Sequence, residues 1–544
     1  MSEKAESISP GLPPQPGLGT TNIAAGPPPL MGGSSFSNMM LFWASFFTLI
    51  AAGMGFSIRG DIIGDWGRQF GFTQTELGII TGQGLAGFGL TIIFFSFFSD
   101  LFGYGILMVI AFFLHALSVA LTLAAPLAFQ HYGKEGAFWC LNLGAWAFSL
   151  GNGTCEAVIN PLTATLFPQN KTHWLNILHA GWPGGLVLGA LVNLGLNQLP
   201  SLGMPTVGWQ VRWGIIFAPM FLYAVMMIGR PFPKSEAHVS GISLGSMILT
   251  LFSPILLFLF LIHIMVGYVE LGTDSWIQNI TNTVLNNKTL ALVAFIWTNL
   301  LMFTLRFFAG PIVHKISPIG LLFASAVLGT AGLVLLGLPV SDTAVLWLLA
   351  VTVYGIGKTF YWPTMLGVIS ERFPRGGALA LGISGGLGMI SAGFLGGPVI
   401  GYQQDYAASS ELKRTSDPAY DRYKSDEPHS PLPFLPKLAG LDNAKVGVLK
   451  DPAQLTADLE RDPQDKNLLA LKAWWLTHGE PNAGADKGEV TAAEVDGGKK
   501  ALLWTAIIPG VMAGCYLLLI VIFAATGGYK QVHIADEGVG PTEY

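Results

Sequence analysis

The feature that most constrains this chain is a series of long apolar stretches with almost no charge. Residues 243–269, for example, contain no aspartate, glutamate, lysine or arginine. A helix needs about 20 mostly apolar residues to cross the hydrocarbon core of a bilayer. Only 11% of all residues are charged, against about 25% in soluble domains. The sequence therefore predicts an all-α polytopic membrane protein.

The apolar stretches define about twelve candidate spans, with ends placed to within about 2–4 residues. They form two groups on either side of a polar linker, residues 231–241. The first group comprises 38–58, 75–98, 105–127, 136–160, 174–197 and 209–230. The second comprises 243–270, 288–309, 317–338, 344–367, 378–401 and 501–527. Two similar groups are typical of transporters built from repeated bundles.

The polar segments complete the expected domain organisation. Residues 1–37 are rich in proline, glycine and serine and predict a disordered tail, without the pattern of a signal peptide. We expect a six-helix bundle at 38–230, the linker at 231–241, helices 7–11 of a second bundle at 242–402, an extracytoplasmic insert at 403–499, helix 12 at 500–527 and a tail at 528–544.

The insert is mostly polar and interrupted by prolines, and only residues 456–480 predict a short amphipathic helix. We expect a solvated elaboration, with a lid or partner-docking element over the outer mouth as the alternative.

An even number of spans places both termini on one side of the membrane, and the bias of basic residues in short loops indicates which side. Loops on the side of the termini carry Lys171, Arg230, Lys234, Lys315, Arg372 and Arg375, and the opposite loops carry Arg68, Lys134, Arg212 and Lys288. We therefore expect a multi-pass protein of the cell inner (plasma) membrane with both termini in the cytoplasm.

Several classes of function are disfavoured. Cys140, Cys155 and Cys515 all lie in apolar spans, where they are typical packing groups rather than a disulfide framework or metal set. No basic patch with interleaved aromatic residues indicates nucleic-acid binding. We find no Ser/His/Asp arrangement, no paired metal ligands and no phosphate-cradling loop, so we expect neither an enzyme nor a cofactor or metal. We expect a monomer in the lipid bilayer.

Charged residues inside a membrane span are costly and normally face protein or a water-filled space. In this chain we find them in the first, fourth, seventh and tenth spans. They are Arg59, Asp61, Glu156, Glu270, Asp274 and Lys358. Their restriction to four spans is informative, because a random scatter of charges would also reach the other spans.

Glu156 has the most informative surroundings. Asn152, Glu156 and Asn160 are four residues apart, so they share one helix face. Pro161 removes a backbone donor and leaves a carbonyl one turn back for a polar ligand or water. Desolvation favours the neutral form of a carboxylic acid, and such a group can carry a proton and release it to water. The alternative is a static, hydrogen-bonded structural acid.

The other candidates have competing interpretations. Lys358 pairs with Glu156 or Glu270, or it binds an anionic substrate. Arg59 and Asp61 belong to a substrate and proton site, or they mark the wet end of the first span. The further candidates for substrate contact are Gln83, Asn176, His179, Trp276, Tyr361 and Trp362. Aromatic faces suit sugar rings, although tryptophan and tyrosine also form belts at membrane interfaces, and an interior histidine is often only a hydrogen-bonded core residue.

Several motifs resemble one transporter family. The segments "CEAVINPLTATLFP" and "LNILHAGWPGG" are similar to the fourth and fifth spans of the fucose:proton symporter family of the major facilitator superfamily. "YVELGTDSW" and "FYWPTMLG" resemble its seventh and tenth spans. Ungapped, the acid of the family's first span falls on Gly60, next to Asp61, and its span-five Gln and Asn fall on His179 and Trp182.

The resemblance implies a major facilitator fold of twelve helices in two bundles, with the first, fourth, seventh and tenth spans lining a central cavity. It implies alternating access and proton-driven uptake of a sugar or related small polar solute. The acid of the fourth span is a coupling residue in that family, a role that carries over to Glu156. We expect Asp61, Glu270 and Asp274 to share in coupling. An organic-anion or sugar-acid symporter that uses Lys358 and Arg59 is the alternative within transport, and a non-transporting membrane sensor is the alternative of another class.

Overall fold

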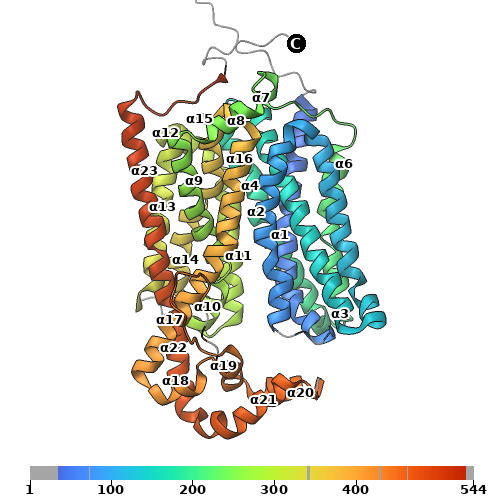
Figure 1. Ribbon diagram of the computed structural model, residues 1–544, viewed down its shortest axis with the longest axis vertical. Coiled ribbons are helices and arrows are strands. Elements are labelled where there is room, and N and C mark those ends of the chain that lie inside the picture. Colours follow the sequence, from blue (N-terminus) through green and yellow to red (C-terminus); the bar gives the residue numbers. More distant parts are fainter. Residues whose placement is uncertain are drawn as a thin grey trace, which may run out of the picture. The chain divides into compact units, whose positions relative to one another are not determined.

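The computed structural model describes residues 35–70, 72, 74–339, 343–426, 428, 430–461 and 463–534. Within these ranges the chain is helical and has no strand, as the apolar pattern predicts (Figure 1). Residues 1–34 of the predicted tail lie outside the described residues, and the first helix begins at Ser35. The helices before the linker, which we call the N-terminal half, are α1 (Ser35–Phe70), α2 (Gln74–Phe102), α3 (Tyr104–Leu166), α4 (Lys171–Gln198), η1 (Leu199–Leu202), α5 (Trp209–Gly214) and α6 (Phe217–Met227).

The linker contains the short helix α7 (Glu236–Val239). The helices that follow form the C-terminal half: α8 (Leu244–Leu251), α9 (Pro254–Gly267), η2 (Tyr268–Gly272), α10 (Ile277–Leu285), α11 (Lys288–Arg306), α12 (Ala309–Ile316), α13 (Pro318–Gly337), α14 (Ala344–Lys358), α15 (Tyr361–Arg372), η4 (Pro374–Gly376), α16 (Gly377–Ser391), η5 (Ala392–Gly396), α17 (Gly397–Thr415), α18 (Asp417–Tyr423), α19 (Asn443–Lys450), α20 (Pro452–Arg461), α21 (Lys466–Trp474), η6 (Trp475–Gly479), η7 (Glu480–Asn482), α22 (Ala483–Thr505) and α23 (Ile507–Ala525).

Local sequence signals explain several helix starts. Ser243, Asn287, Ser317 and Thr343 each precede a helix, and each side-chain oxygen accepts a hydrogen bond from the backbone N–H three residues later. These residue types favour the position before a helix because they satisfy an amide that has no partner within the helix.

Eleven helical segments of the described residues are long and apolar enough to cross a membrane. One of them is α3, whose 63 residues form two helices joined at a bend, Gly133, where the backbone is not helical (φ 63°, ψ −156°). The predicted spans 105–127 and 136–160 lie on either side of this bend. Each of the other ten predicted spans overlaps one of the remaining segments. The prediction of an all-α protein with many apolar spans is therefore confirmed, and the number of twelve crossings stays a prediction.

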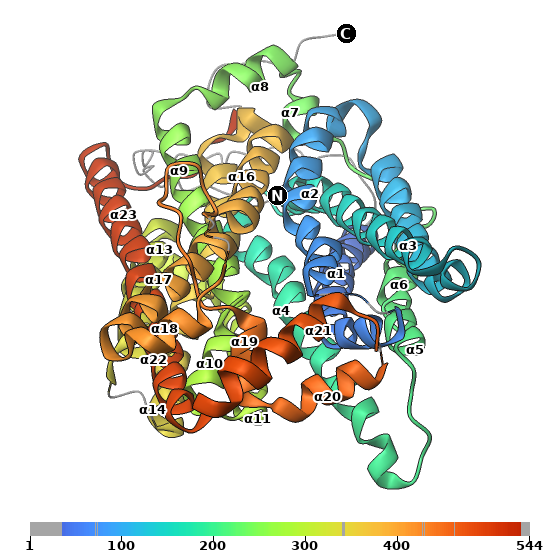
Figure 2. The ribbon, with the colours of Figure 1, turned by 60° about the horizontal axis from the view of Figure 1, so that its bottom comes forward.

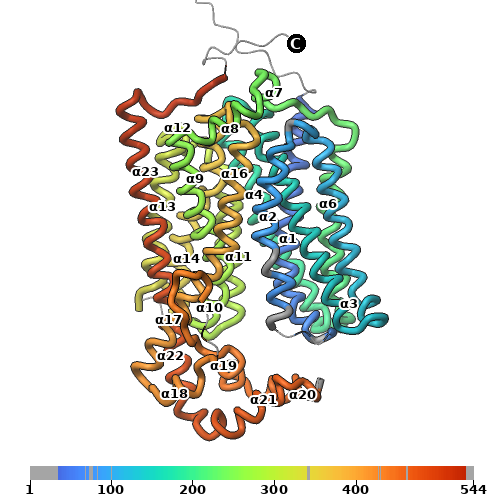
Figure 3. Tube along the Cα trace, in the orientation of Figure 1, coloured from blue at the N-terminus to red at the C-terminus, as the bar shows by residue number. Residues whose placement is uncertain are grey.

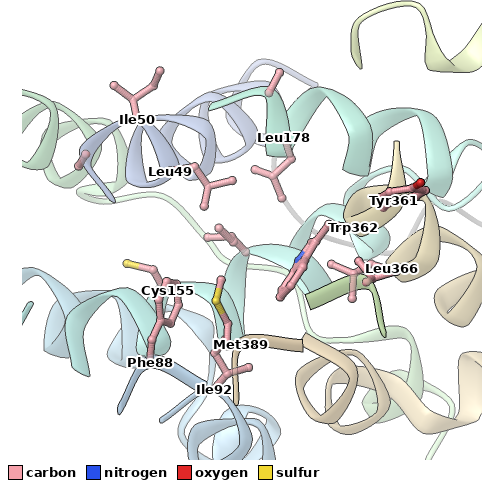
Figure 4. Close-up of a cluster of buried hydrophobic side chains, with 14 of the residues drawn as sticks. Leu49, Ile50, Phe88, Ile92, Cys155, Leu178, Tyr361, Trp362, Leu366 and Met389 are labelled. Atoms are coloured by element: carbon pink, nitrogen blue, oxygen red, sulfur yellow. The ribbon is translucent and has the colours of Figure 1, made fainter. Parts of the chain in front are cut away.

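Each half is held together by helices that run side by side. In the N-terminal half α1 packs along α4 and α2 packs along α3; in the C-terminal half α13 packs against α14 and α23, and α9 against α16. The halves meet where α2 contacts α16 and where α4 contacts α11 and α15. Figure 4 shows part of this junction, with Phe88 of α2, Cys155 of α3 and Leu178 of α4 near Trp362 of α15 and Met389 of α16. All five side chains are buried.

Two glycines show how close the helices come. A Cβ atom added to Gly53 of α1 would lie 2.3 Å from the carbonyl oxygen of Trp182 in α4. At Gly267 of α9 it would lie 2.0 Å from the carbonyl oxygen of Gly388 in α16. Both distances are far shorter than a carbon–oxygen contact, so only glycine allows these backbones to touch. Small residues at helix crossings are the usual means of packing within lipid.

The part of the chain predicted as an insert is largely helical. Its ends, near residues 403 and 499, lie within α17 and α22, which pack against each other. Between them, α18 to α21 surround a separate apolar cluster that includes Leu412, Tyr423 and Trp475. Figures 1 and 3 show these helices beyond one end of the helical array, opposite α7 and α8. Both views in Figures 1 and 2 show α20 and α21 reaching from the C-terminal half toward the end of α1. We call this the insert end and the opposite end, which holds α7, the linker end.

Candidate functional site

A small cavity of about 20 Å³ lies between the two halves and brings together several of the predicted residues. A space of that size has room for about one water molecule. Its walls are formed by Glu156, His179 and Trp182 of the N-terminal half and by Glu270, Leu271, Arg306, Trp362 and Met389 of the C-terminal half. We call this the junction cavity.

Glu156, Asn160 and His179 form a hydrogen-bonded chain on the N-terminal side of the junction cavity. The amide nitrogen of Asn160 donates to the carboxylate of Glu156 at 2.6 Å, because residues four apart on α3 lie one above the other. The Nε2 atom of His179 lies 2.8 Å from the side-chain oxygen of Asn160. Since that oxygen only accepts, His179 donates from Nε2. All three side chains are buried.

Glu270 faces Glu156 from the other half and has a cationic partner. Its carboxylate lies 3.0 Å from a terminal nitrogen of Arg306 and accepts the backbone N–H of Trp362 at 3.2 Å. Glu270 lies in η2, a single π-type turn between α9 and α10. Turns of this kind are frequent at functional sites because they redirect side chains within a helix.

Arg306 is the residue of this site that the sequence prediction missed. It ends α11, within the predicted span 288–309, and only 1% of its surface is exposed. The expectation that buried charge is confined to the first, fourth, seventh and tenth spans is therefore wrong. The rule that singled out Glu156, a charge inside an apolar stretch, would have found Arg306 as well, since it follows the uncharged stretch from Thr289 to Leu305.

Lys358 is paired with neither of the acids that the sequence suggested. Its ammonium group forms an ion pair with Asp274, and the lysine side chain is buried. Asp61 is likewise paired with Arg212 of α5, at 2.8 Å. The acids of these two pairs, Asp61 and Asp274, line a wider cavity and not the junction cavity.

The wider cavity has a volume of about 440 Å³ and lies between the junction cavity and the insert end. Its polar wall is formed by Ser57, Asp61, Asn193, Asn197, Asp274, Ser275 and Gln278. Asp61, Ser275 and Gln278 are exposed, so the cavity reaches solvent there. Trp182 and Leu271 line both cavities and therefore separate them. We call this wider space the vestibule.

Four predicted residues make contacts elsewhere. Asn152 bonds to His115 at 3.0 Å inside the N-terminal half and does not join Glu156 and Asn160. Asn176 donates to the hydroxyl of Thr364 at 3.1 Å. The Tyr361 hydroxyl donates to the carbonyl of Ser325 at 3.0 Å, and the Trp276 indole donates to the carbonyl of Gly397 at 2.7 Å.

Arg59 is buried, with its guanidinium 4.8 Å from the ring centre of Phe56 and 5.9 Å from that of Phe148. Arg59 lines neither of the two cavities. The side chain of Gln83 lies outside the described residues. Of the predicted set, the junction cavity thus unites Glu156, His179, Glu270 and Trp362, with Asn160 behind Glu156.

At the linker end the two halves are joined by polar contacts. Lys171 of α4 forms an ion pair with Glu236 of α7 at 2.8 Å. The carboxylate of Glu371 in α15 accepts from the backbone N–H of Thr172 at 3.1 Å and from its hydroxyl at 2.6 Å. Tyr529, beyond the last helix, also donates to Glu371, at 2.7 Å. Burial raises the pKa of Tyr529 well above its ordinary value, so the hydroxyl keeps its proton and remains a donor.

Among the residues that the structure describes, no three histidine, cysteine, aspartate or glutamate side chains are grouped so that they could hold a metal ion. What the site offers is two carboxylates, one hydrogen-bonded and one ion-paired, on opposite sides of a junction between two helical halves. A vestibule open at one end and polar contacts closing the other are typical of a membrane transporter, whose two halves meet at a central site.

The sequence confirms this class. Residues 31–397 match the model of the Major Facilitator Superfamily, which is more than half of the chain. The protein belongs to that superfamily of transporters. A search of curated proteins gave no match.

Solved structures share the fold at low sequence identity. The transporter FucP in an outward conformation is 18% identical, with a TM-score of 0.55, over 68% of this chain and 93% of that one. A variant of FucP is named as the E. coli fucose:proton symporter. The xylose transporter XylE from E. coli, partially occluded and inward-open, is 14% identical, with a TM-score of 0.52, over 66% and 91%. A bacterial homologue of the human lysosomal transporter Spinster is 14% identical, with a TM-score of 0.58, over 89% and 97%. At these identities the likeness establishes the fold alone.

Proposed function

We propose that this protein is a secondary active transporter that moves a small uncharged polar solute, such as a sugar, together with a proton by alternating access. Its twelve spans form two six-helix bundles, at 38–230 and at 242–402 with 500–527. The bias of basic residues in the short loops favours a cytoplasmic position for the linker end and for both termini, in a protein of the cell inner membrane. Residues 403–499 then lie outside, near the mouth of the vestibule.

The observation that carries the proposal is the state of Glu156. Among the described residues it forms no ion pair; its partner is the neutral amide of Asn160 at 2.6 Å. It is buried at 3% exposure and lines the junction cavity. A buried carboxylate without a cation is costly, whereas a protonated one is not. Glu156 therefore suits a group that carries a proton in one conformation and loses it when water enters.

The pairing of Lys358 and Arg306 with carboxylates favours a neutral solute over an anion. Lys358 is neutralised by Asp274 and Arg306 by Glu270. An anionic substrate would have to compete with these carboxylates, whereas a hydroxyl-rich solute can bond to the vestibule's Asn193, Asn197 and Gln278. Trp182 and Trp362 offer aromatic faces next to the junction cavity. FucP and XylE are named as symporters of fucose and of xylose with protons, which agrees with this solute class.

The proposal is tested by transport in proteoliposomes with a pH gradient, after a thermal-shift screen of neutral sugars and sugar acids has found a stabilising solute. The Glu156→Gln variant should lose uphill accumulation and keep counterflow exchange of labelled solute, because exchange needs no net proton movement. Glu135→Gln, an exposed acid on the same helix, is the control and should behave like the parent protein. Uphill accumulation by Glu156→Gln at the parent rate would refute the coupling role. Stabilisation by sugar acids alone would reject the neutral solute, and accumulation driven only by a sodium gradient would reject the proton.

A further inference from the structure

Arg306 uses its guanidinium to hold three groups on three separate parts of the chain: α4, η2 and the turn between α14 and α15. Its Nε atom donates to the carbonyl of Thr359 at 2.8 Å. One terminal nitrogen donates to the carbonyl of His179 at 2.5 Å, and the other pairs with Glu270 at 3.0 Å. His179 belongs to α4 of the N-terminal half, whereas Arg306, Thr359 and Glu270 belong to the C-terminal half. One of the three bonds therefore crosses the junction.

The carbonyl of His179 is available because of a proline, and that of Thr359 because it lies in the turn between α14 and α15. In an α-helix the carbonyl of residue i accepts the N–H of residue i+4, and a proline at i+4 has no N–H to give. Pro183 stands four residues after His179, and Pro363 stands four residues after Thr359. A buried carbonyl without a partner is destabilising. Pro183 thus creates an acceptor on α4 that needs a donor from outside that helix, and Arg306 supplies it, as it does for the Thr359 carbonyl in the turn before α15.

The position of Arg306 makes the cross-junction bond sensitive to conformation. The guanidinium lines the junction cavity together with Trp182 and Leu271, which also form the floor of the vestibule. A rigid movement of one half against the other keeps the bonds to Thr359 and Glu270, because these move with Arg306. It breaks the bond to His179, because α4 belongs to the other half.

We propose that Arg306 is a positioning residue that clamps the two halves in this conformation by holding the carbonyl that Pro183 leaves open on α4. Glu270 and the Thr359 carbonyl orient the guanidinium, and the carbonyl of His179 accepts its third hydrogen bond. Opening of the linker end requires this one bond to break. The inference rests on the alternating-access part of the proposed function.

The test asks which end of the protein is open, so it needs no knowledge of the solute. In a variant without the three native cysteines, Ser57→Cys reports on the vestibule and Ala164→Cys reports on a linker-end cavity that Ala164 lines. The rate of alkylation by a membrane-impermeant maleimide is measured for each reporter. Pro183→Ala leaves Arg306 in place but supplies a backbone N–H at residue 183. This N–H can bond to the His179 carbonyl within α4 and so replace the bond from Arg306. We expect Ala164→Cys to react at least tenfold faster and Ser57→Cys to react correspondingly more slowly.

Two further variants distinguish the clamp from a general effect of proline. Pro363→Ala also removes a proline next to the junction cavity, but it touches no bond between the two halves, so its effect on both rates should be smaller than that of Pro183→Ala. Pro126→Ala, in α3, is the control and should leave both rates unchanged. Parent-like rates in a folded Pro183→Ala protein would overturn the clamp, as would equal effects of Pro183→Ala and Pro126→Ala. The Glu156→Gln test measures transport, whereas this test measures the accessibility of the two cysteines. A failure of proton coupling would therefore not change the alkylation rates expected here.

Discussion

Replacing Thr172 by valine removes one hydroxyl from the contacts that close the linker end. That hydroxyl donates to Glu371 at 2.6 Å, across the junction between α4 and α15. Valine has nearly the same shape, and the backbone N–H of residue 172 keeps its own bond to Glu371 at 3.1 Å. A hydrogen bond to a charged group contributes about 1.5–3 kcal/mol. The bond exists only while the linker end is closed, so its loss shifts the equilibrium toward opening by roughly 10–150-fold.

The alkylation rate of Ala164→Cys measures this shift, and we expect the Thr172→Val variant to react about tenfold faster or more. The Thr298→Val variant is the matched control, because among the described residues that buried hydroxyl bonds to carbonyls of its own helix, α11, and to no other group. An unchanged rate in a Thr172→Val protein with the parent's unfolding temperature would refute the reasoning. It would mean that the contact to Glu371 is not part of what keeps the linker end shut.

Two other predictions concern stability. Gly53→Ala should lower the thermal unfolding midpoint, because its Cβ would lie 2.3 Å from a carbonyl oxygen of α4. Such a clash typically costs about 1–3 kcal/mol. Gly60→Ala, on the same helix, should not lower the midpoint, because its added Cβ would meet no neighbouring atom within 4 Å. Arg422→Ala should make residues 416–482 more sensitive to limited proteolysis, because it leaves the buried carboxylate of Asp486 unpaired at a cost of about 3 kcal/mol. Arg414→Ala removes an exposed ion pair and should leave the cleavage rate unchanged. Equal midpoints for the two glycine variants, or equal cleavage of the two arginine variants, would contradict these arguments.

The apolar spans could be read from the sequence because lipid imposes a single length and a single composition on any helix that crosses it. Every predicted span falls on a helical segment of that kind. The two separate spans predicted at 105–127 and 136–160 agree with the break at Gly133 within α3, whereas the helical turns between each span and that break were not predicted. Helices α18 and α19 and the separate apolar cluster were also not predicted, because short amphipathic helices around a core of their own give no long apolar signal. Within residues 456–480, where a short amphipathic helix was expected, the chain forms α21 and the end of α20.

The candidate site was predicted in part. Glu156, Asn160, His179, Glu270 and Trp362 meet at or beside the junction cavity, as expected for charges and polar groups that span helices cannot expose to lipid. Asn152 shares the helix face of Glu156 but bonds to His115. Spacing along one helix places residues on a face and does not say which neighbouring side chain that face will meet.

The sequence by itself determined which residues could not face lipid: the buried acids, the buried bases and the prolines that remove a backbone donor. Only the tertiary structure decided the pairing, with Arg306 on Glu270, Lys358 on Asp274 and Glu156 left to an amide. The physical reason is that the free-energy cost of burying a charge depends on the group and on its own span. The ion pair or hydrogen bond that offsets this cost depends on which groups of other spans come within hydrogen-bond distance. That distance is set by how the helices pack, down to the glycines that let them touch.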